Sequence, residues 1–385
     1  MWRQCGVVLL AVAVCGTIPS GLAGELEHTT ASLSAARGWL AAASVGDKAL
    51  FAGGDFRGIF ATVDIYDSVS GAWSATSLSA PRSHLAGASA GTKALFAGGW
   101  GGISPSSAVD IYDDRTDTWT VEHLSQARWF LAGASVGSKV LFAGGFSTDT
   151  YSAPSAVVDI YDVDTGLWST AELSQARGQL SAVTVGTKVF FAGGYYESNE
   201  NGFSWYRSDV VDIYDNQAGT WTTASLSVAR TVLASAGVGG FALFGGGDAG
   251  WEFDGDTNLV DICDVTTQQW STGTLSFPRE ILAATSVGQM AFFGGGIYGS
   301  LCRKDVDIFD ATTGTWSTDQ LSVARYGLAA TSVNGLAIFA GGGVGGDYYS
   351  ARVDIFRVPE PCTILLLSLG SLALVRRRRR AVRGR

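Results

Sequence analysis

The sequence predicts an all-β fold, a β-propeller, in which seven small sheets form a closed ring. One motif recurs seven times at intervals of 45 to 53 residues, a period typical of propellers and solenoids. Each copy contains short segments in which apolar residues alternate with others, the pattern of half-buried strands. The 51 glycines and 46% hydrophobic residues among 385 residues argue against both a helical bundle and disorder.

Each copy begins with Leu-Ser, two variable residues and an arginine. A run of small residues follows, and a Gly-centred turn then leads to a strand such as Ala49-Leu-Phe-Ala52 that ends at a glycine pair. After a variable loop comes a third strand, Val63-Asp-Ile-Tyr-Asp67 in the first copy, and a tryptophan marks the fourth. Each unit is therefore expected to be four antiparallel strands, a to d. The repeated arginines are Arg37, Arg82, Arg128, Arg177, Arg230, Arg279 and Arg325, and the tryptophans are Trp73, Trp119, Trp168, Trp221, Trp270 and Trp316.

The two ends of the repeat region are predicted to complete one blade. Residues His28 to Ser34 read as a fourth strand without the first three, and the last copy ends at Arg357 without a fourth. Joining these fragments would close the ring and leave no sheet edge open between blades. The expected domain is therefore residues 24–357, with seven blades.

The glycine pair, the strand with two aspartates and the tryptophan six residues later resemble the Kelch repeat, and the resemblance covers residues 28–357. It implies the propeller fold but not a function, because such propellers include enzymes, protein binders and carbohydrate binders. Some Kelch-like propellers of the galactose oxidase type are copper enzymes that need two histidines. Here His28, His84 and His123 occupy strand or strand-edge positions and are not expected to converge, so that site is not carried over.

The repeated residues are interpreted as structural. Each arginine is expected to pair with a strand aspartate, within a blade or between blades. Each tryptophan is expected to fill space between adjacent sheets, and the glycine pair to allow close backbone approach or a positive φ.

Functional residues are expected where the copies differ. The b-to-c and d-to-a connections should emerge on one face, and all variation in repeat length lies in the b-to-c loops. Aromatic rings beside carboxylates suit sugar binding, although these rings could equally pack their own loops. The candidate ligand-binding residues are Tyr195, Tyr196, Trp205, Tyr206, Trp251, Tyr348 and Tyr349.

Two further kinds of site are considered on these loops. Asp254, Asp256 and Asn258 alternate like the ligands of a calcium loop, but Leu259 and Val265 replace the expected glycine and glutamate. A solvated acidic turn is the alternative. Paired carboxylates, such as Glu197 with Asp254, would suit a glycan-processing enzyme. No nucleophile elbow, phosphate loop or other catalytic motif occurs.

Charge and cysteine content exclude other classes. The formal net charge is −9, and eight of the 26 basic residues lie at the two ends, so the body is more acidic still. Such a body repels phosphate backbones, so no nucleic-acid partner is expected. Only Cys263 and Cys302 lie in the body, and two isolated thiols are favoured over one disulfide.

Both ends read as targeting segments. Residues 1–23 have the layout of a secretory signal peptide, with a cut after Ala23. Residues 358–385 combine Pro359-Glu360-Pro361, an apolar run too short to span a bilayer comfortably, and an arginine cluster. This order resembles the PEP-CTERM sorting signal. The resemblance implies export in a Gram-negative bacterium, transient anchoring in the inner membrane and processing by an exosortase; a permanent single-pass tail is the alternative.

The sequence therefore predicts an exported, non-enzymatic binding or matrix protein of the bacterial surface, without a required cofactor. Its loop face would recognise a polysaccharide or a surface protein. A glycan-processing enzyme and a purely structural protein-binding scaffold remain the alternatives, and a flat loop face without a pocket would favour the scaffold.

Overall fold

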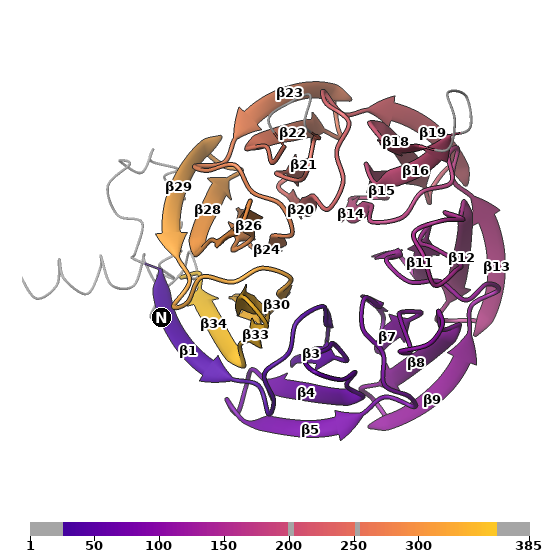
Figure 1. The fold of residues 1–385 in the computed structure, drawn as a ribbon, viewed down its shortest axis with the longest axis vertical. Coiled ribbons are helices and arrows are strands. Elements are labelled where there is room, and N and C mark those ends of the chain that lie inside the picture. Colours follow the sequence, from indigo (N-terminus) through magenta and orange to yellow (C-terminus); the bar gives the residue numbers. More distant parts are fainter. Residues whose placement is uncertain (1–25, 199–203, 251–254, 360–385) are drawn as a thin grey trace, which may run out of the picture. The chain divides into compact units, whose positions relative to one another are not determined.

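Seven four-stranded antiparallel sheets stand in a ring around a central axis (Figure 1). The computed structural model describes residues 26–198, 204–250 and 255–359, and the propeller comprises Glu27–Val358. All regular structure in these residues is β-strand. No helix among them is long and apolar enough to cross a membrane. The predicted all-β, seven-bladed propeller is confirmed.

Strands a to d follow one another from the axis outwards in each blade. The a strands are β2 (Ala41–Val45), β6 (Ala86–Ala90), β10 (Ala132–Val136), β14 (Ser181–Val185), β20 (Ala234–Val238), β24 (Ala283–Val287) and β30 (Ala329–Val333). The b strands are β3 (Lys48–Ala52), β7 (Lys93–Ala97), β11 (Lys139–Ala143), β15 (Lys188–Ala192), β21 (Phe241–Gly245), β25 (Met290–Gly294) and β31 (Leu336–Ala340). The c strands are β4 (Thr62–Asp67), β8 (Ala108–Asp113), β12 (Val157–Asp162), β18 (Val210–Asp215), β22 (Leu259–Asp264), β28 (Asp305–Asp310) and β34 (Arg352–Arg357). The d strands are β5 (Trp73–Ser77), β9 (Thr118–His123), β13 (Leu167–Glu172), β19 (Thr220–Ser225), β23 (Gln269–Thr274), β29 (Thr315–Gln320) and β1 (Glu27–Ser32).

The ring is closed by β1, which pairs antiparallel with β34 as the outer strand of the seventh blade. Glu27 lies opposite Arg357 and Ser32 opposite Arg352. The strand ends two residues earlier than expected, because Leu33 turns inwards and is buried, and its N–H donates to the carbonyl of Ala351. The sheet is therefore built from both ends of the repeat region.

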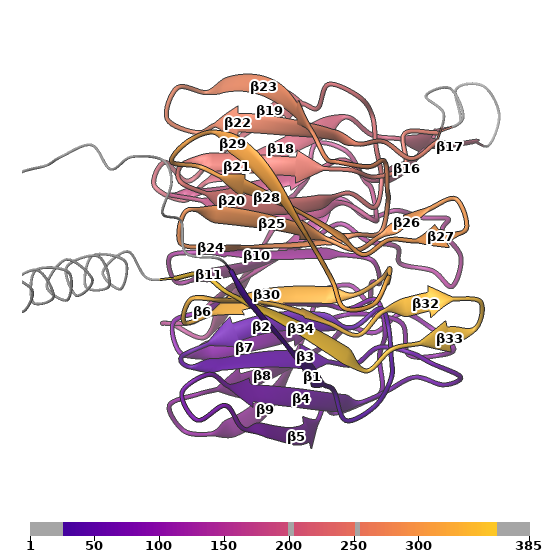
Figure 2. The same ribbon diagram turned by 90° about the vertical axis from the view of Figure 1, so that its left-hand side faces the viewer.

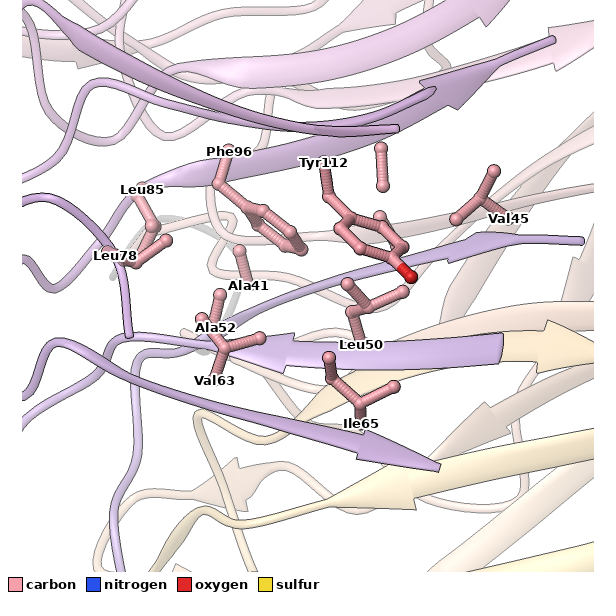
Figure 3. Packing of buried hydrophobic residues seen from close by; sticks show 12 residues of the cluster. Ala41, Val45, Leu50, Ala52, Val63, Ile65, Leu78, Leu85, Phe96 and Tyr112 are labelled. Atoms are coloured by element: carbon pink, nitrogen blue, oxygen red, sulfur yellow. The ribbon is translucent and has the colours of Figure 1, made fainter. Parts of the chain in front are cut away.

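Side chains from neighbouring blades interlock to form the core. Figure 3 shows the cluster between the first two blades, where Leu50 and Val63 of one sheet meet Phe96 and Tyr112 of the next. All four are almost completely buried. The repeated tryptophans pack against these clusters from the d strands, so that Trp119, for example, covers the first interface. In β1 a histidine takes this place, and His28 stacks on Phe356 with ring centroids 4.3 Å apart.

The repeated arginines lie fully buried on the connections between blades. Arg37 reaches Asp64 on the c strand of the blade that it precedes, at 2.7 Å, and also donates to the carbonyls of Phe51 and Gly53. The same aspartate accepts the N–H of Ser34, which follows the d strand of the preceding blade. The expected pair therefore joins adjacent blades. The other six pairs are Arg82–Asp110, Arg128–Asp159, Arg177–Asp212, Arg230–Asp261, Arg279–Asp307 and Arg325–Asp354.

The glycine pair is required both by backbone conformation and by space. Gly53 and Gly54 have φ angles of 67° and 104°, which side chains other than glycine rarely adopt. A Cβ atom on Gly53 would lie 2.3 Å from the carbonyl oxygen of Arg82 in the next blade. The pair therefore allows each b strand to end against the neighbouring blade.

Three b-to-c loops contain small hairpins of their own, which the sequence did not predict. They are β16 with β17 (Tyr195–Ser198 and Ser204–Arg207), β26 with β27 (Ile297–Tyr298 and Leu301–Cys302) and β32 with β33 (Gly343–Gly345 and Tyr348–Tyr349). Figure 2 shows all three on the same face of the ring. This is the face on which the sequence placed the variable loops.

Candidate functional site

The d-to-a connections place a ring of side chains at the mouth of the central channel. Two residues after each repeated arginine stands a residue in the left-handed region, with φ between 47° and 58°. Six of the seven are not glycine, although this conformation costs about 1–2 kcal/mol for a residue with a Cβ atom. They are Trp39, His84, Phe130, Gln179, Val232, Ile281 and Gly327.

A closed circle of backbone hydrogen bonds holds these seven residues. The N–H of Trp39 donates to the carbonyl of Gly327 at 2.9 Å, and that of His84 donates to Trp39 at 2.9 Å. The pattern repeats through every blade until Gly327 donates to Ile281 at 3.0 Å. Because each unit supplies one donor and one acceptor to its neighbours, the strained conformation is fixed by all seven blades together. We call these residues the mouth ring.

A second position of the repeat lies directly beside the mouth ring. The residue after each arginine forms an antiparallel bridge with the first residue after the glycine pair of the same blade. Gly178 is bridged in this way to Tyr195, Thr231 to Asp248, and Glu280 to Ile297. The scaffold thereby fixes loop residues such as Tyr195 and Asp248 close to the axis.

These two positions enclose a cavity of ≈ 620 Å³. Aromatic residues of the first three blades line one side, and residues of the fourth to sixth blades, most of them polar, line the other. The aromatic side consists of Trp39, His84, Phe130 and Tyr151, and the other side of Gln179, Tyr195, Thr231, Val232, Asp248, Glu280 and Ile281. The volume lies within the range of about 300–1,000 Å³ that is usual for small-molecule sites.

The aromatic side is held in place by ring contacts and one hydrogen-bonded chain. Trp39 stacks on His84 with centroids 4.7 Å apart and meets Phe130 edge-on at 5.9 Å. The indole N–H of Trp39 donates to the Tyr349 hydroxyl, which in turn donates to Asp55. Burial lowers the pKa of His84 to about 3, so this ring is neutral and acts as part of the apolar wall.

The polar side contains one ion pair and one carboxylate without a partner. The Arg207 guanidinium lies 2.6 Å from Asp248 and over the ring of Tyr195, 5.4 Å from its centroid. Among the described residues, nothing forms a hydrogen bond or ion pair with the Glu280 carboxylate. Burial, together with the charges of Asp256 and Asp248, raises the pKa of Glu280 to about 7 against the opposing effect of Arg207. Glu280 therefore changes charge near neutral pH.

The predicted loop aromatics divide between the cavity and other places. Tyr195 lines the cavity. The hydroxyl of Tyr349 accepts a hydrogen bond from the indole N–H of Trp39. Tyr196 and Tyr206 face each other across the β16–β17 hairpin, with ring centroids 5.6 Å apart. Tyr348 is 64% exposed and does not line the cavity. Trp205 lies in β17, and Trp251 lies outside the described residues.

The residues of the suggested calcium loop have separate contacts where they are described. Asp256 accepts the N–H of Gly299 at 3.0 Å, and the amide of Asn258 donates to the carbonyl of Leu275 at 3.3 Å. Asp254 lies outside the described residues. In the described parts of the chain, no three His, Cys, Asp or Glu side chains come together as metal ligands would.

The remaining predictions concern the two cysteines, the suggested carboxylate pair and the two targeting segments. Cys263 and Cys302 are not bonded to each other. Glu197 accepts the N–H of Ala153 at 3.4 Å, while its suggested partner Asp254 is not described. Of the suggested sorting motif only Pro359 lies within the described residues, and the suggested signal peptide lies wholly outside them. Glu360 and Pro361 also lie outside them.

Sequence reasoning missed most of the cavity lining, including Trp39, Phe130, Tyr151 and Glu280. His84, expected at a strand or strand-edge position, lies in the connection between β5 and β6, two residues before β6 begins, and belongs to the mouth ring. A signal was present, because the two residues after each arginine vary within an otherwise uniform motif. Attention to loop length alone overlooked these short connections.

Comparison with known families agrees with this architecture. The family model of the Kelch motif matches residues 81–122, which cover the second blade. None of the curated proteins compared with the sequence matches it. The chain thus contains a Kelch motif within a seven-bladed β-propeller.

Proposed function

We propose that the protein is an exported, non-enzymatic carbohydrate-binding propeller whose ligand occupies the central cavity. The observation that carries this proposal is the division of the cavity into an aromatic side and a side of hydrogen-bonding groups. Sugar rings present apolar C–H faces that pack on aromatic rings, and hydroxyls that bind carboxylates and amides. Trp39 and Phe130 supply the first kind of surface, and Gln179 and Asp248 supply the second.

A cavity of ≈ 620 Å³ suits part of a glycan. The Kelch motif by itself also fits the alternative of a protein-binding scaffold. Export and presentation at the bacterial surface complete the proposal. They rest on the sequence features of residues 1–23 and 358–385, and an exosortase-type enzyme would process the tail.

A glycan array probed with the full-length protein tests this proposal. Selective retention of one group of glycans is expected, and retention of none would contradict it. The variant Trp39→Ala should weaken binding about fivefold or more, because it removes a stacking surface worth about 1 kcal/mol or more. Tyr348→Ala is the matched control: this exposed tyrosine lies on the same face but outside the cavity, and its loss should leave binding unchanged.

A second candidate function is hydrolysis of a glycan, which one observation favours. Glu280, with a pKa of about 7, lies in the same cavity as Asp248, which is paired with Arg207. An acid kept protonated beside an ionised carboxylate is the usual arrangement in glycosidases. Release of reducing sugar from a bound oligosaccharide, abolished in Glu280→Gln, would establish this activity. Binding without turnover would leave the non-enzymatic proposal in place.

A further inference from the structure

The charges around the cavity are not balanced. Asp248 and Glu280 line it, Asp256 lies close enough to raise the pKa of Glu280, and Arg207 is the one cation that acts on this group from the described residues. Within the part of the chain that the structure describes, no lysine or arginine lines the cavity.

Arg207 is already committed to Asp248. Its guanidinium is 2.6 Å from that carboxylate and rests on the ring of Tyr195. The Glu280 side chain, by contrast, is half-buried and has no ionic or hydrogen-bonding partner among the described residues. A partly desolvated carboxylate without a partner is unfavourable, and a cation supplied by a ligand would relieve this cost.

The aromatic wall of the same cavity favours a cation with an attached carbon ring. Trp39, Phe130 and Tyr151 line that wall, and aromatic faces attract both C–H groups and positive charge. A small inorganic cation would leave this wall unused. A neutral sugar would leave the negative charge uncompensated.

We infer that the ligand is an amino sugar with a free ammonium group, as in a de-N-acetylated glucosamine polymer. The ammonium group binds Glu280 on the acidic side, and the sugar ring packs on Trp39. This inference rests on the proposed carbohydrate-binding function and specifies its substrate class.

Calorimetric titration with two trisaccharides tests the inference on the full-length protein at pH 7. One is built from glucosamine with free amines, and the other is its fully N-acetylated counterpart, which has the same rings without the charges. The free-amine trisaccharide is expected to bind at least tenfold more tightly. In Glu280→Gln this ratio of affinities should fall towards one.

One control separates a specific contact from general attraction to an acidic protein, and a second measurement shows whether the charge of the ligand contributes to binding. Asp164→Asn removes an exposed carboxylate on a c-to-d turn, the face opposite the cavity, and should leave the ratio unchanged. In the unmodified protein, raising the salt concentration should weaken binding of the free-amine trisaccharide more than that of the acetylated one. This second measurement needs no variant and therefore does not depend on the folding of Glu280→Gln.

The outcomes distinguish the inference from the function on which it rests. Equal or tighter binding of the acetylated trisaccharide would overturn the ammonium inference and leave carbohydrate binding intact. Binding of neither sugar would overturn both. A lysine-containing peptide is titrated in parallel, and if it alone bound, in a manner that depended on Glu280, the ligand would be a protein and the carbohydrate proposal would fail.

Discussion

The pKa of Glu280 is raised because of the position that this residue occupies in the repeat. It directly follows Arg279, whose burial draws the connection into the molecule, and it is bridged to Ile297 at the edge of the cavity. Burial and the nearby carboxylates then raise its pKa to about 7. In other blades the same position holds Gly38, Ser83 or Thr231, so one substitution within a uniform motif is enough to create a titrating group.

This shift predicts a specific dependence of stability on pH. The pKa of Glu280 is raised from an ordinary value of 4.5 to about 7 in the folded state, so folding favours the protonated form. Its contribution to stability is complete below about pH 4.5 and is lost as the pH rises through 7. The free energy of unfolding of Glu280→Gln, measured by urea denaturation, should therefore improve relative to the unmodified protein across this interval.

The comparison needs an exposed carboxylate that lies outside the cavity. Asp164→Asn removes an exposed group, and its stability curve should run parallel to that of the unmodified protein. A parallel curve for Glu280→Gln would show that the carboxyl titrates in the folded state as it does in the unfolded chain.

The cavity residues show why sequence reasoning found only part of the site. Tyr195 was identified because it stands in the longest loop, while Trp39 and Phe130 stand in connections of constant length. Their importance follows from the left-handed conformation that carries them to the channel mouth. Non-glycine residues rarely adopt that conformation, so no propensity rule would have placed them there.

At the scale of the elements, the buried Arg–Asp pairs fasten each blade to the preceding one. Arg128 and Asp159 are both almost fully buried. Asp159 also accepts the N–H of Ser125, which follows β9, the d strand of the preceding blade. Removing one partner would leave a buried charge without compensation.

Arg128→Met should therefore lower the free energy of unfolding by about 3–5 kcal/mol. Adding Asp159→Asn should recover part of this loss, because the asparagine is neutral and still accepts the Ser125 N–H. Lys93→Met is the control, since the Lys93–Asp113 pair at 2.8 Å is partly exposed and should be worth less than about 1 kcal/mol. Similar losses in both single variants, measured by denaturant titration, would contradict the role assigned to burial.

Strands were easier to predict than the loops between them. The alternation in segments such as 63–67 reflects a sheet that buries its residues between neighbours, and the observed strand, Thr62–Asp67, differs by one residue. The hairpins within the b-to-c loops were missed because their strands are short, from two residues in β26 and β27 to four in β16 and β17. Segments this short show no periodicity.

At the scale of the whole molecule, closure depends on a strand that is distant in sequence. β1 pairs with β34 along six residues, and His28 also contacts Asp354 at 2.8 Å. A protein that begins at Ser34 would lack this strand and expose the edge of β34. We expect a lower melting temperature and self-association, detected by thermal unfolding and size-exclusion chromatography.

A protein that begins at Gly24 retains β1 and serves as the control. It should melt like the unmodified propeller and elute as a single species of the same size. If the shorter protein behaved in the same way, the seventh blade would be stable with three strands and β1 would not be needed for closure.

The number of blades and their closure could be predicted because both depend on counting repeats and on the split blade. The cavity could not, since it depends on how side chains from six different blades meet at the axis. The shape of the cavity depends on the sizes of the mouth-ring side chains. Trp39 is large, for example, whereas Gly327 has no side chain. That distribution differs from copy to copy and has no period.

The pairing of Glu27 with Arg357 places both ends of the propeller domain on the same face of the ring. β1 begins and β34 ends on the face of the c-to-d turns, so the flanking chain joins the propeller there on both sides. The cavity opens on the other face. A label or support attached at either end of the propeller, next to Glu27 or Val358, would therefore leave the mouth of the cavity free.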